Sequence, residues 1–367
     1  MSRVHLGDVA IEHKETCKED KSMYPIVGLE HLTPEQITLQ NWDLNTENTF
    51  TKVFRKGNIL FGRRRAYLKK AAVAPFDGIC SGDITVIEAK EDKIIPELLP
   101  FVIQNDDLFD FAVGKSAGSL SPRVKWTHLK NYEFELPTKE KQRELAKVLW
   151  AIEDTRKSYQ ELIKRTDELV KSQFIEMFVG KYPMISLGDE IKTTSGGTPS
   201  KKKEEYYLNG NIPWLTSGEV NLGYVDSTQN FITQAGLDNS SAKWVPENSV
   251  VIAMYGATAG KVGVIRIPVT TNQAICTLLP NPEFETLYLY HACKNKEKWM
   301  LSKCAGAAQP NISQTVIKEM QIEKPPVEVQ KQFVEFIEQS DKSKFELNRA
   351  LDELTATYKQ IIKDNLG

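Results

Sequence analysis

Apolar and small residues recur at alternating steps of three and four through two long stretches, residues 137–178 and 325–366. This spacing is that of the a and d positions of a two-stranded coiled coil. In the first stretch these positions are Leu145, Val148, Ile152, Thr155, Tyr159, Leu162, Thr166 and Leu169. In the second stretch they are Phe333, Ile337, Ser340, Lys344, Leu347, Leu351, Leu354, Tyr358 and Ile361. A helix of roughly 40 residues is about 60 Å long, so each stretch is predicted to be a spacer that needs a partner helix.

Both stretches begin with the same pattern, P-x-x-E-x-Q, at Pro137 and again at Pro325. A proline ends the preceding element, and a glutamate in the first turn suits the positive end of the helix dipole. Residues 167–169 and 352–354 also share the sequence Asp-Glu-Leu. The alternative is two unrelated amphipathic helices, each covering its own core. The shared start favours a pair of helices that pack on each other.

The stretches between the helices repeat as well. Leu-Gly-Asp at residues 6–8 recurs at 187–189, residues 57–60 resemble 247–250, and residues 116–118 resemble 304–306. Between these marks the two copies differ strongly. A common frame with different contents is typical of two modules of one design that are adapted to different ligands. We therefore predict four segments, which are a module at 1–136, a helix at 137–180, a module at 181–324 and a helix at 325–367.

Each module reads as a mixture of short strands and helices. In the first, strands are predicted at 58–62, 71–74 and 83–87, with a strand start at 24–28, a helix at 97–113 and a loop at 114–123. In the second, strands are predicted at 212–215, 249–254 and 261–265, with a helix at about 284–301. The predicted fold class is α+β, with two globular domains separated by two long antiparallel coiled-coil helices and related by a pseudo-twofold internal repeat. The segment near Leu366 is then expected to return to the N-terminus.

Composition sets broad limits. The chain has 367 residues, of which 41% are hydrophobic and 26% are charged. It carries neither an apolar run long enough to span a membrane nor a signal peptide pattern, so a cytoplasmic location and no membrane partner are expected. Its five cysteines are scattered without C-x-x-C spacing, which argues for a reducing compartment and against a zinc site or a disulfide scaffold.

The formal net charge of −2 does not indicate a nucleic-acid partner, but the charge distribution does. Residues 48–76 contain no acid and eight bases, which are Lys52, Arg55, Lys56, Arg63, Arg64, Arg65, Lys69 and Lys70. Residues 111–132 contain no acid and four bases, and the windows 248–282 and 298–318 repeat this arrangement more weakly. A charge run is often only a solvated face. Acid-free windows at matching places in two modules favour a polyanion that both modules approach.

Catalytic patterns are missing from the sequence. Gly260-Lys261 and Gly114-Lys115-Ser116 suggest a P-loop, but Tyr255 and Phe109 stand where the pattern needs its first glycine. The five histidines show no H-E-x-x-H pattern, and neither an amino-methyltransferase Asn/Asp-Pro-Pro-Tyr stretch nor a nuclease triad is found. We therefore expect no catalytic residue, no metal site and no enzyme activity in this chain.

Several motifs occur together, and most of them lie in the second module. They are Ser195-Gly-Gly-Thr-Pro-Ser200, Glu205-Tyr-Tyr207, residues 212–219 (IPWLTSGE), residues 256–263 (GATAGKVG), residues 271–275 (TNQAI) and residues 306–313 (GAAQPNIS). With the paired P-x-x-E-x-Q starts, they make the chain resemble the specificity subunit of a type I restriction–modification system over its whole length. The first module departs from the pattern, because it lacks the Gly-Gly-Thr-Pro-Ser segment and Gly82-Asp83 stands where Asn272-Gln273 does.

This resemblance implies a non-catalytic subunit. Each module would be a target recognition domain that reads one half of a bipartite, asymmetric target in double-stranded DNA. The helices would set the spacing of the halves and dock methyltransferase (M) subunits, and endonuclease/translocase (R) subunits would join outside them. S-adenosylmethionine, ATP and Mg would then belong to the partner subunits, with no cofactor on this chain.

Candidate DNA-binding residues follow from the chemistry of recognition. Arginine and lysine pair with guanine edges and phosphates, whereas Asn, Gln, Ser and Thr read adenine or hold phosphates. Glycine-rich segments are expected to let the backbone approach the duplex. In the first module the candidates are Arg63, Arg64, Arg65, Lys69, Lys115, Ser116 and Arg123. In the second they are Lys201, Lys202, Tyr255, Thr258, Lys261, Gln309 and Asn311. Each could instead be an ordinary surface residue.

Two other classes of function stay open on the residues alone. A scaffold would use the helices to join two protein-binding modules, but it would not need acid-free windows. A single-chain restriction enzyme would need methyltransferase and nuclease motifs, which the sequence lacks. Binding to random duplex DNA, with and without a methyltransferase partner, separates a DNA reader from a scaffold.

Overall fold

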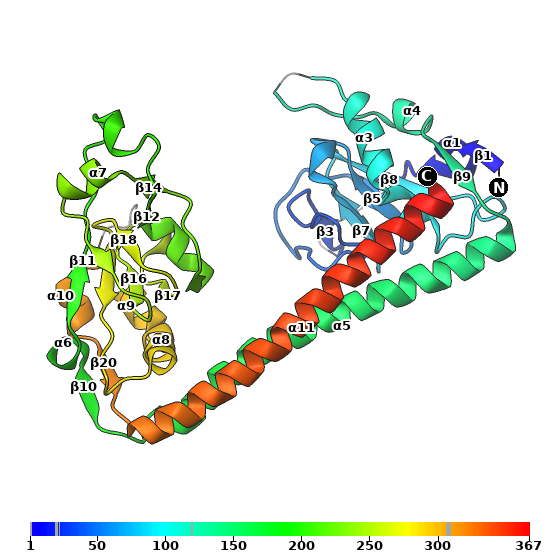
Figure 1. The fold of residues 1–367 in the computed structure, drawn as a ribbon. Coiled ribbons are helices and arrows are strands. Elements are labelled where there is room, and N and C mark those ends of the chain that lie inside the picture. The colour runs from blue at the N-terminus through cyan, green and yellow to red at the C-terminus, as the bar shows by residue number, and fades with distance from the viewer. Residues whose placement is uncertain (1, 19–20, 22, 119, 306–309) are drawn as a thin grey trace. The chain divides into compact units, whose positions relative to one another are not determined.

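The computed structural model describes residues 2–18, 21, 23–118, 120–305 and 310–367 (Figure 1). The chain forms two compact units. Unit 1 comprises Met1–Glu161 and Leu347–Gly367, and unit 2 comprises Leu162–Glu346. Two 40-residue helices, α5 (Lys139–Phe178) and α11 (Val327–Leu366), each contribute one part to either unit. Among the described residues, no helix is both long and apolar enough to cross a membrane.

Unit 1 is built on a four-stranded antiparallel sheet with the order β2-β8-β5-β6. A three-stranded sheet, β3-β7-β4, has one parallel pair, β3 with β7, and β1 pairs antiparallel with β9. The strands are β1 (Ser2–His5), β2 (Ala10–Glu12), β3 (Ile26–Val27), β4 (Lys52–Phe54), β5 (Ile59–Gly62), β6 (Ala71–Val73), β7 (Gly78–Cys80), β8 (Ile84–Ala89) and β9 (Glu133–Leu136). The helical elements outside the long helices are α1 (Leu6–Val9), η1 (Ala66–Leu68), α2 (Leu99–Ile103), α3 (Asp106–Gly114) and α4 (Trp126–Leu129).

Unit 2 repeats this topology strand by strand. Its main sheet has the order β11-β19-β16-β17-β13, its second sheet β14-β12-β18-β15, and β10 pairs with β20. The strands are β10 (Met184–Ser186), β11 (Thr193–Ser195), β12 (Ile212–Leu215), β13 (Tyr224–Val225), β14 (Phe231–Ile232), β15 (Trp244–Val245), β16 (Val250–Ala253), β17 (Val262–Ile265), β18 (Val269–Thr271), β19 (Ile275–Leu278) and β20 (Gln321–Glu323). The helical elements are α6 (Leu187–Glu190), η2 (Glu204–Tyr206), η3 (Ser217–Leu222), α7 (Gln234–Asp238), η4 (Gly256–Thr258), α8 (Thr286–Asn295), α9 (Glu297–Ser302) and α10 (Gln314–Lys318). Within the described residues, β13 and β14 are the two strands that unit 2 has beyond those of unit 1, so the predicted internal repeat and the α+β class are confirmed.

The two helices predicted inside the modules are each broken in two. The stretch 97–113 forms α2 and α3, because the Asn105 side chain accepts a hydrogen bond from the backbone N–H of Asp107 at 3.1 Å and caps a new helix. The stretch 284–301 forms α8 and α9, which meet at Lys296. The single-helix predictions were therefore wrong at these two joints. The apolar stripe alone does not reveal such a break.

The shared helix start has a structural explanation in two buried glutamines. The Gln142 amide donates to the Pro137 carbonyl at 2.8 Å and accepts from the backbone N–H of Ile95 at 2.9 Å. In unit 2 the Gln330 amide donates to the Pro325 carbonyl at 2.9 Å and accepts from the backbone N–H of Glu285 at 2.8 Å. Each glutamine thus ties the first turn of a long helix to the domain that precedes it. Since both side chains are buried, this hydrogen bonding explains why the motif occurs twice.

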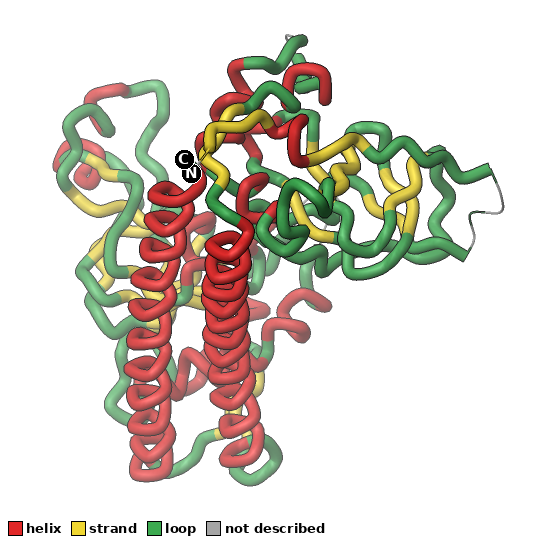
Figure 2. The backbone as a smooth tube through the Cα atoms, turned by 90° about the vertical axis from the view of Figure 1, so that its right-hand side faces the viewer, coloured by secondary structure: helices red, strands yellow, loops and turns green. Residues whose placement is uncertain are grey.

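The long helices run antiparallel within each unit, and Figure 2 shows them as the two longest red tubes. In unit 2, Phe174 packs against Phe333, and Asp167 pairs with Lys344 at 2.9 Å. A lower residue number in α5 thus pairs with a higher one in α11, as in antiparallel helices. In unit 1, the Arg156 guanidinium lies 5.4 Å from the centre of the Tyr358 ring. Leu366 is fully buried in the same hydrophobic cluster as Leu6, as expected for a chain end that returns to the first module.

The predicted seam is correct at all positions of α11 but only in part for α5, where five of the eight predicted positions are buried or half-buried and Val148, Leu162 and Leu169 are exposed. All nine predicted positions of α11 are buried or half-buried. In α5, Val148 and Leu169 are 48% and 52% exposed, whereas their neighbours Leu149 and Val170 are buried. The helix also packs on the domain cores, because Leu149 shares a cluster with core residues of unit 1 and Val170 with those of unit 2. A face that covers both a partner helix and a domain core is wider than an a/d seam, and its centre is displaced.

His291, in unit 2, is expected to make stability depend on pH. Its ring lies among Phe174, Tyr290 and Phe333, with centroid distances of 6.4, 4.9 and 5.4 Å. Burial is the main cause that lowers the pKa of His291 to about 3, and the charge of Lys294 is the next. Together they outweigh the charges of Asp341 and Asp167, which raise this pKa. The unfolded chain binds this proton near pH 6.5, so stability decreases as the pH falls below that value.

Between pH 7 and pH 5, the free energy of unfolding is expected to fall by on the order of 1–2 kcal/mol from this group alone. Urea unfolding at both pH values measures the change. The variant His291→Phe keeps an aromatic ring without a titrating nitrogen and should lose this part of the pH dependence. The same pH dependence in the variant would contradict the assignment to His291.

Candidate nucleic-acid interface

Two separate segments that carry arginines lie side by side at the end of β5 in unit 1. The first segment, Arg63, Arg64 and Arg65, directly follows the strand. The second contains Arg123, whose backbone forms a bridge with that of Arg64. The backbone N–H of Arg65 donates to the Pro122 carbonyl at 2.8 Å, and that of Val124 donates to the Arg63 carbonyl at 2.9 Å. We call Arg64, Arg65 and Arg123 the basic cluster. Arg123 lies almost 60 residues from Arg64 and Arg65 in sequence, yet the two segments are hydrogen-bonded neighbours.

Asp83, which the sequence reasoning did not select, organises this cluster. Its carboxylate accepts hydrogen bonds from Arg123 Nε at 2.7 Å and Arg123 Nη2 at 3.1 Å, and Arg64 Nη1 lies 3.6 Å away. Arg64 Nε also donates to Ser121 Oγ at 2.5 Å. The hydrogen bond from Arg123 is the main reason that the pKa of Asp83 is lowered. The aspartate is therefore ionised at neutral pH and fixes the orientation of two guanidinium groups.

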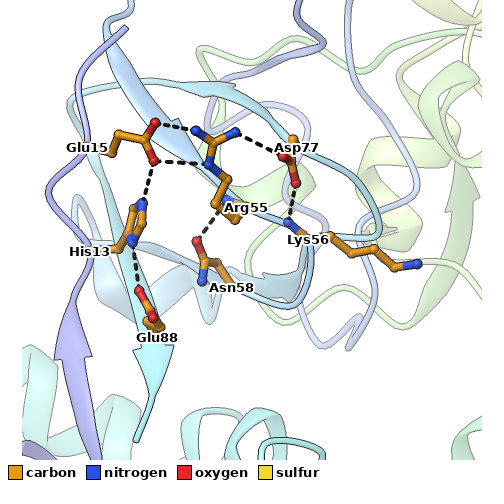
Figure 3. A network of polar contacts seen from close by, with 7 residues as sticks. All are labelled: His13, Glu15, Arg55, Lys56, Asn58, Asp77 and Glu88. Atoms are coloured by element: carbon orange, nitrogen blue, oxygen red, sulfur yellow. Dashed lines mark hydrogen bonds and ion pairs between the residues drawn. The ribbon is translucent and has the colours of Figure 1, made fainter.

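Acidic residues from other parts of unit 1 lie beside the bases of the acid-free window at residues 48–76. The Arg55 guanidinium donates hydrogen bonds to two acids (Figure 3). Its Nε and Nη2 donate to the Glu15 carboxylate, with an Nε distance of 3.0 Å, and its Nη1 donates to Asp77 at 3.0 Å. In the same network His13 lies between Glu15 and Glu88, with ring nitrogens 3.2 and 2.7 Å from their carboxylates. Acids from other strands and loops thus neutralise part of the predicted basic face. In the basic cluster two of the three arginines share one such acid, Asp83, whereas Arg55 alone contacts two, so the charge argument is stronger for the basic cluster than for the whole window.

Two candidate residues of unit 1 adopt the left-handed backbone conformation that favours glycine. Arg65 has φ 55° and Lys69 has φ 49°, and η1 lies between them. The corresponding turn of unit 2 carries Gly256 with φ 78° and Gly260 with φ 80°. A non-glycine residue in this region costs roughly 1–2 kcal/mol. Unit 1 therefore keeps the same turn at a conformational cost and gains two cationic side chains.

Unit 2 has the same arrangement of segments with uncharged residues. The backbone of Tyr255 bridges to Asn311, as Arg64 does to Arg123, and the N–H of Gly256 donates to the Pro310 carbonyl at 3.0 Å. Asn311 also bridges to Ala305, as Arg123 does to Ala117. Tyr255 and Asn311 are both exposed. Of the candidates in this unit, these two form a surface equivalent to the basic cluster.

Of the remaining candidates, four have side chains engaged elsewhere in the protein and three are exposed lysines. In unit 1, Lys69 forms an ion pair with Asp106 at 2.5 Å, Lys115 is exposed and Ser116 Oγ donates to the Ala112 carbonyl at 2.8 Å. In unit 2, Thr258 Oγ1 donates to the Ser217 carbonyl at 3.0 Å and Lys261 pairs with Glu297. Lys201 and Lys202 lie exposed in the turn after Ser200, and Gln309 lies outside the described residues.

The correspondence between the modules is shifted by one residue from the predicted one. The N–H of Ser81 donates to the Val27 carbonyl, and the N–H of Asn272 donates to the Leu215 carbonyl, on equivalent strands. Ser81-Gly82 therefore corresponds to Asn272-Gln273, and Asp83 corresponds to Ala274. Hydrogen bonding from β3 and β12 fixes this register, which the divergent sequences could not reveal. The acid that orients the basic cluster thus has no counterpart in unit 2.

The Gly-Gly-Thr-Pro-Ser segment has a packing role. A Cβ atom on Gly196 would lie 1.8 Å from the Thr271 carbonyl oxygen, and one on Gly197 would lie 2.6 Å from the backbone of Ser241. These two glycines let the segment lie against β18, so the predicted approach to a duplex does not explain them. Thr198, further along, donates to the side chain of Gln273. Within the described part of the chain, no group of three or more His, Cys, Asp or Glu side chains is arranged to hold a metal ion.

Comparison with known proteins gives consistent matches. Residues 3–165 and 179–355 each match the family described as type I restriction modification DNA specificity domain. The specificity subunit of the type I restriction enzyme EcoR124I/EcoR124II from Escherichia coli is 28% identical over 183 residues, which is 48% of this chain and 45% of that relative. The specificity subunit of the type I restriction enzyme MjaIX from Methanocaldococcus jannaschii is 27% identical over 169 residues, which is 44% of this chain and 39% of that relative. The chain thus spans less than half the length of these curated relatives.

Solved structures share the fold. A chain from a study of complex assembly and conformational transition of the type I R-M system has a TM-score of 0.63 and 20% identity, with 99% of this chain and 97% of that chain covered. The type I restriction-modification S subunit from M. genitalium has a TM-score of 0.58 and 14% identity, with 100% and 96% covered. Together with two family matches that span most of the sequence, the repeated topology identifies this chain as a member of the type I restriction modification DNA specificity domain family, with two copies of the domain.

Proposed function

We propose that this chain is the DNA-recognition subunit of a type I restriction–modification complex. Each of its two domains reads one half of a bipartite, asymmetric DNA target. The basic cluster of Arg64, Arg65 and Arg123 faces the DNA in unit 1, and Tyr255 and Asn311 take the corresponding place in unit 2. The chain acts without a catalytic group of its own, in line with relatives that are named specificity subunits.

One observation carries this proposal. The two domains keep the same paired segments, with the same backbone bridges, but present arginines in one and a tyrosine with an asparagine in the other. Arginine is suited to guanine edges and phosphates, and asparagine is suited to adenine. A scaffold for two different proteins would vary these side chains as well, but it would not need the residue types that suit base edges and phosphates. Two different half-sites require such variation.

The partners follow from the same proposal. The long helices would set the spacing of the two half-sites and dock methyltransferase subunits, and endonuclease/translocase subunits would join the complex. S-adenosylmethionine, ATP and Mg would be bound by those partners. The exposed apolar residues of α5, Val148 and Leu169 among them, support a helix surface that another protein covers.

Sequencing of methylated bases in cells that express the chain with its methyltransferase partner tests the proposal. The expected result is a single bipartite motif with an unread gap. The variant Arg123→Ala should change or relax only one half of the motif, and Asn311→Ala only the other half. A motif that is not bipartite, or one whose two halves change together in both variants, would overturn the division between the domains.

Asp83 offers a sharper prediction about specificity. Asp83→Asn preserves the size of the side chain but removes the charge that orients Arg64 and Arg123. We expect affinity for random duplex to rise, since a negative charge near the phosphates is lost, while discrimination of the cognate first half-site falls by about tenfold. Competition binding with cognate and random duplexes measures both. An unchanged ratio of the two affinities would show that Asp83 has only a structural role.

A further inference from the structure

Two large apolar side chains project from the turn between the cationic residues of unit 1. The 3₁₀ turn η1 places Ala66 in the hydrophobic core, with 2% of its surface exposed, and turns Tyr67 and Leu68 outward, with 55% and 39% exposed. Arg65 directly precedes η1. The exposed apolar surface therefore adjoins the basic cluster, where a polyanion is the expected partner.

The turn is held rigidly by its backbone. The N–H of Leu68 donates to the Arg65 carbonyl at 2.9 Å, and the N–H of Lys69 donates to the Ala66 carbonyl at 2.9 Å. The side chain of Ala66 is buried in the hydrophobic core of unit 1, and the N–H of Arg65 donates to the Pro122 carbonyl at 2.8 Å. The positions of Tyr67 and Leu68 are therefore fixed relative to the basic cluster. Little order needs to be gained when a ligand binds.

The same turn in unit 2 lacks this apolar surface. The N–H of Gly62 donates to the Lys70 carbonyl at 2.8 Å, and the N–H of Ala253 donates to the Lys261 carbonyl at 2.9 Å, so the two turns are in register. Tyr67 then corresponds to Thr258, whose hydroxyl is bonded within the protein, and Leu68 corresponds to Ala259, which is 3% exposed. The register at the base of the turn is shared, but the turn itself differs, since Ala66 is buried and its counterpart Ala257 is exposed. The exposed pair of large apolar side chains is specific to unit 1.

We infer that Tyr67 and Leu68 read thymine in the first half-site by packing against its 5-methyl group, an inference that rests on the proposed DNA-recognition function. The methyl group is the one apolar feature of the base edges in the major groove, and apolar side chains are its usual readers. The arginines of the basic cluster bind phosphates or guanine and so hold the apolar pair at the bases. Unit 2, with Thr258 and Ala259, does not read its half-site in this way.

A thermodynamic cycle between protein and DNA tests this inference. Once the methylated motif is known, each thymine of the target is replaced in turn by uracil, which lacks only the 5-methyl group. Affinity is measured for the complex with its methyltransferase partner, carrying either the original chain, the double variant Tyr67→Ala with Leu68→Ala, or the control variant Thr258→Ala. Both residues of the pair are exposed, so the thermal unfolding midpoint should not change.

One uracil substitution in the first half-site is expected to weaken binding by about fourfold, the effect of one buried methyl group. The double variant should bind the thymine and uracil duplexes equally, whereas Thr258→Ala should retain the fourfold difference. Uracil in the second half-site should have the same effect on all three proteins. A bipartite motif without a thymine-dependent difference in its first half, or a difference that persists in the double variant, would overturn the inference while leaving the proposed function standing. Loss of the bipartite motif itself would overturn the proposed function.

Discussion

Simultaneous replacement of Arg64, Arg65 and Arg123 by alanine is expected to weaken binding of cognate duplex by about a thousandfold, at roughly tenfold for each lost contact. The three side chains come from two segments that hydrogen bonds hold together, and Asp83 and Ser121 fix the orientation of Arg64. Charged contacts to phosphates release counterions, so the dependence on salt should weaken as well. In a plot of log K against log salt concentration, the slope should decrease by about 0.9 for each phosphate contact removed.

Arg55 provides the matched control for this experiment. It belongs to the same basic window of the sequence, but its single guanidinium contacts two acids, Glu15 and Asp77, whereas two of the three arginines of the basic cluster share Asp83. Arg55→Ala should therefore leave the salt slope unchanged. If Arg55→Ala and the triple variant changed the slope equally, net charge would matter and the basic cluster would not be the binding site.

Phe333→Ala is expected to destabilise unit 2 by about 3–5 kcal/mol, the usual effect of removing a large aromatic side chain from a core. Phe333 is fully buried on α11, where its ring contacts Phe174 at 5.5 Å and Phe178 at 5.3 Å from α5, measured between ring centres. The cavity would lie at the packing of the two helices on the domain. Urea unfolding followed by circular dichroism measures the loss.

Phe345 is the control on the same helix. Its side chain is 66% exposed, so Phe345→Ala should change the free energy of unfolding by less than about 0.5 kcal/mol. Similar losses in the two variants would mean that the helices do not pack through the face that carries Phe333. A large effect of Phe345 alone would point to a different packing face.

The spacing of apolar residues correctly predicted those helices and strands that bury a single apolar face or are apolar throughout. The nine positions of α11 are buried or half-buried as predicted, and the strands β5, β8, β12 and β16 lie within two residues of their predicted bounds. These segments bury one continuous apolar face or are apolar throughout, and such patterns survive in the sequence. The prediction failed at three of the eight positions of α5, because Leu149 and Val170 also pack on domain cores that the helix pattern does not describe.

The candidate interface was predicted in composition but not in geometry. Arg64, Arg65 and Arg123 were selected because their windows lack acids, and the structure brings them together. The same argument selected Lys69 and Lys261, which form ion pairs with Asp106 and Glu297. A linear window has no information about acids on other elements. Asp83 was missed for that reason, since its role depends on a turn that places it beside Arg123.

The fold also determines the order in which its parts can be completed during synthesis. Tyr358, Ile362 and Leu366 of α11 belong to the same buried cluster as Leu6 and Phe101, so the core of unit 1 needs residues from both ends of the sequence. Unit 2 needs nothing beyond Glu346. Domains usually mature from the N-terminus onward as the ribosome elongates the chain. Here the first domain to emerge must wait, with part of its apolar surface uncovered, until the second has been made. Its exposure to chaperones and proteases therefore lasts from the translation of Glu161 until the last turns of α11 have been made.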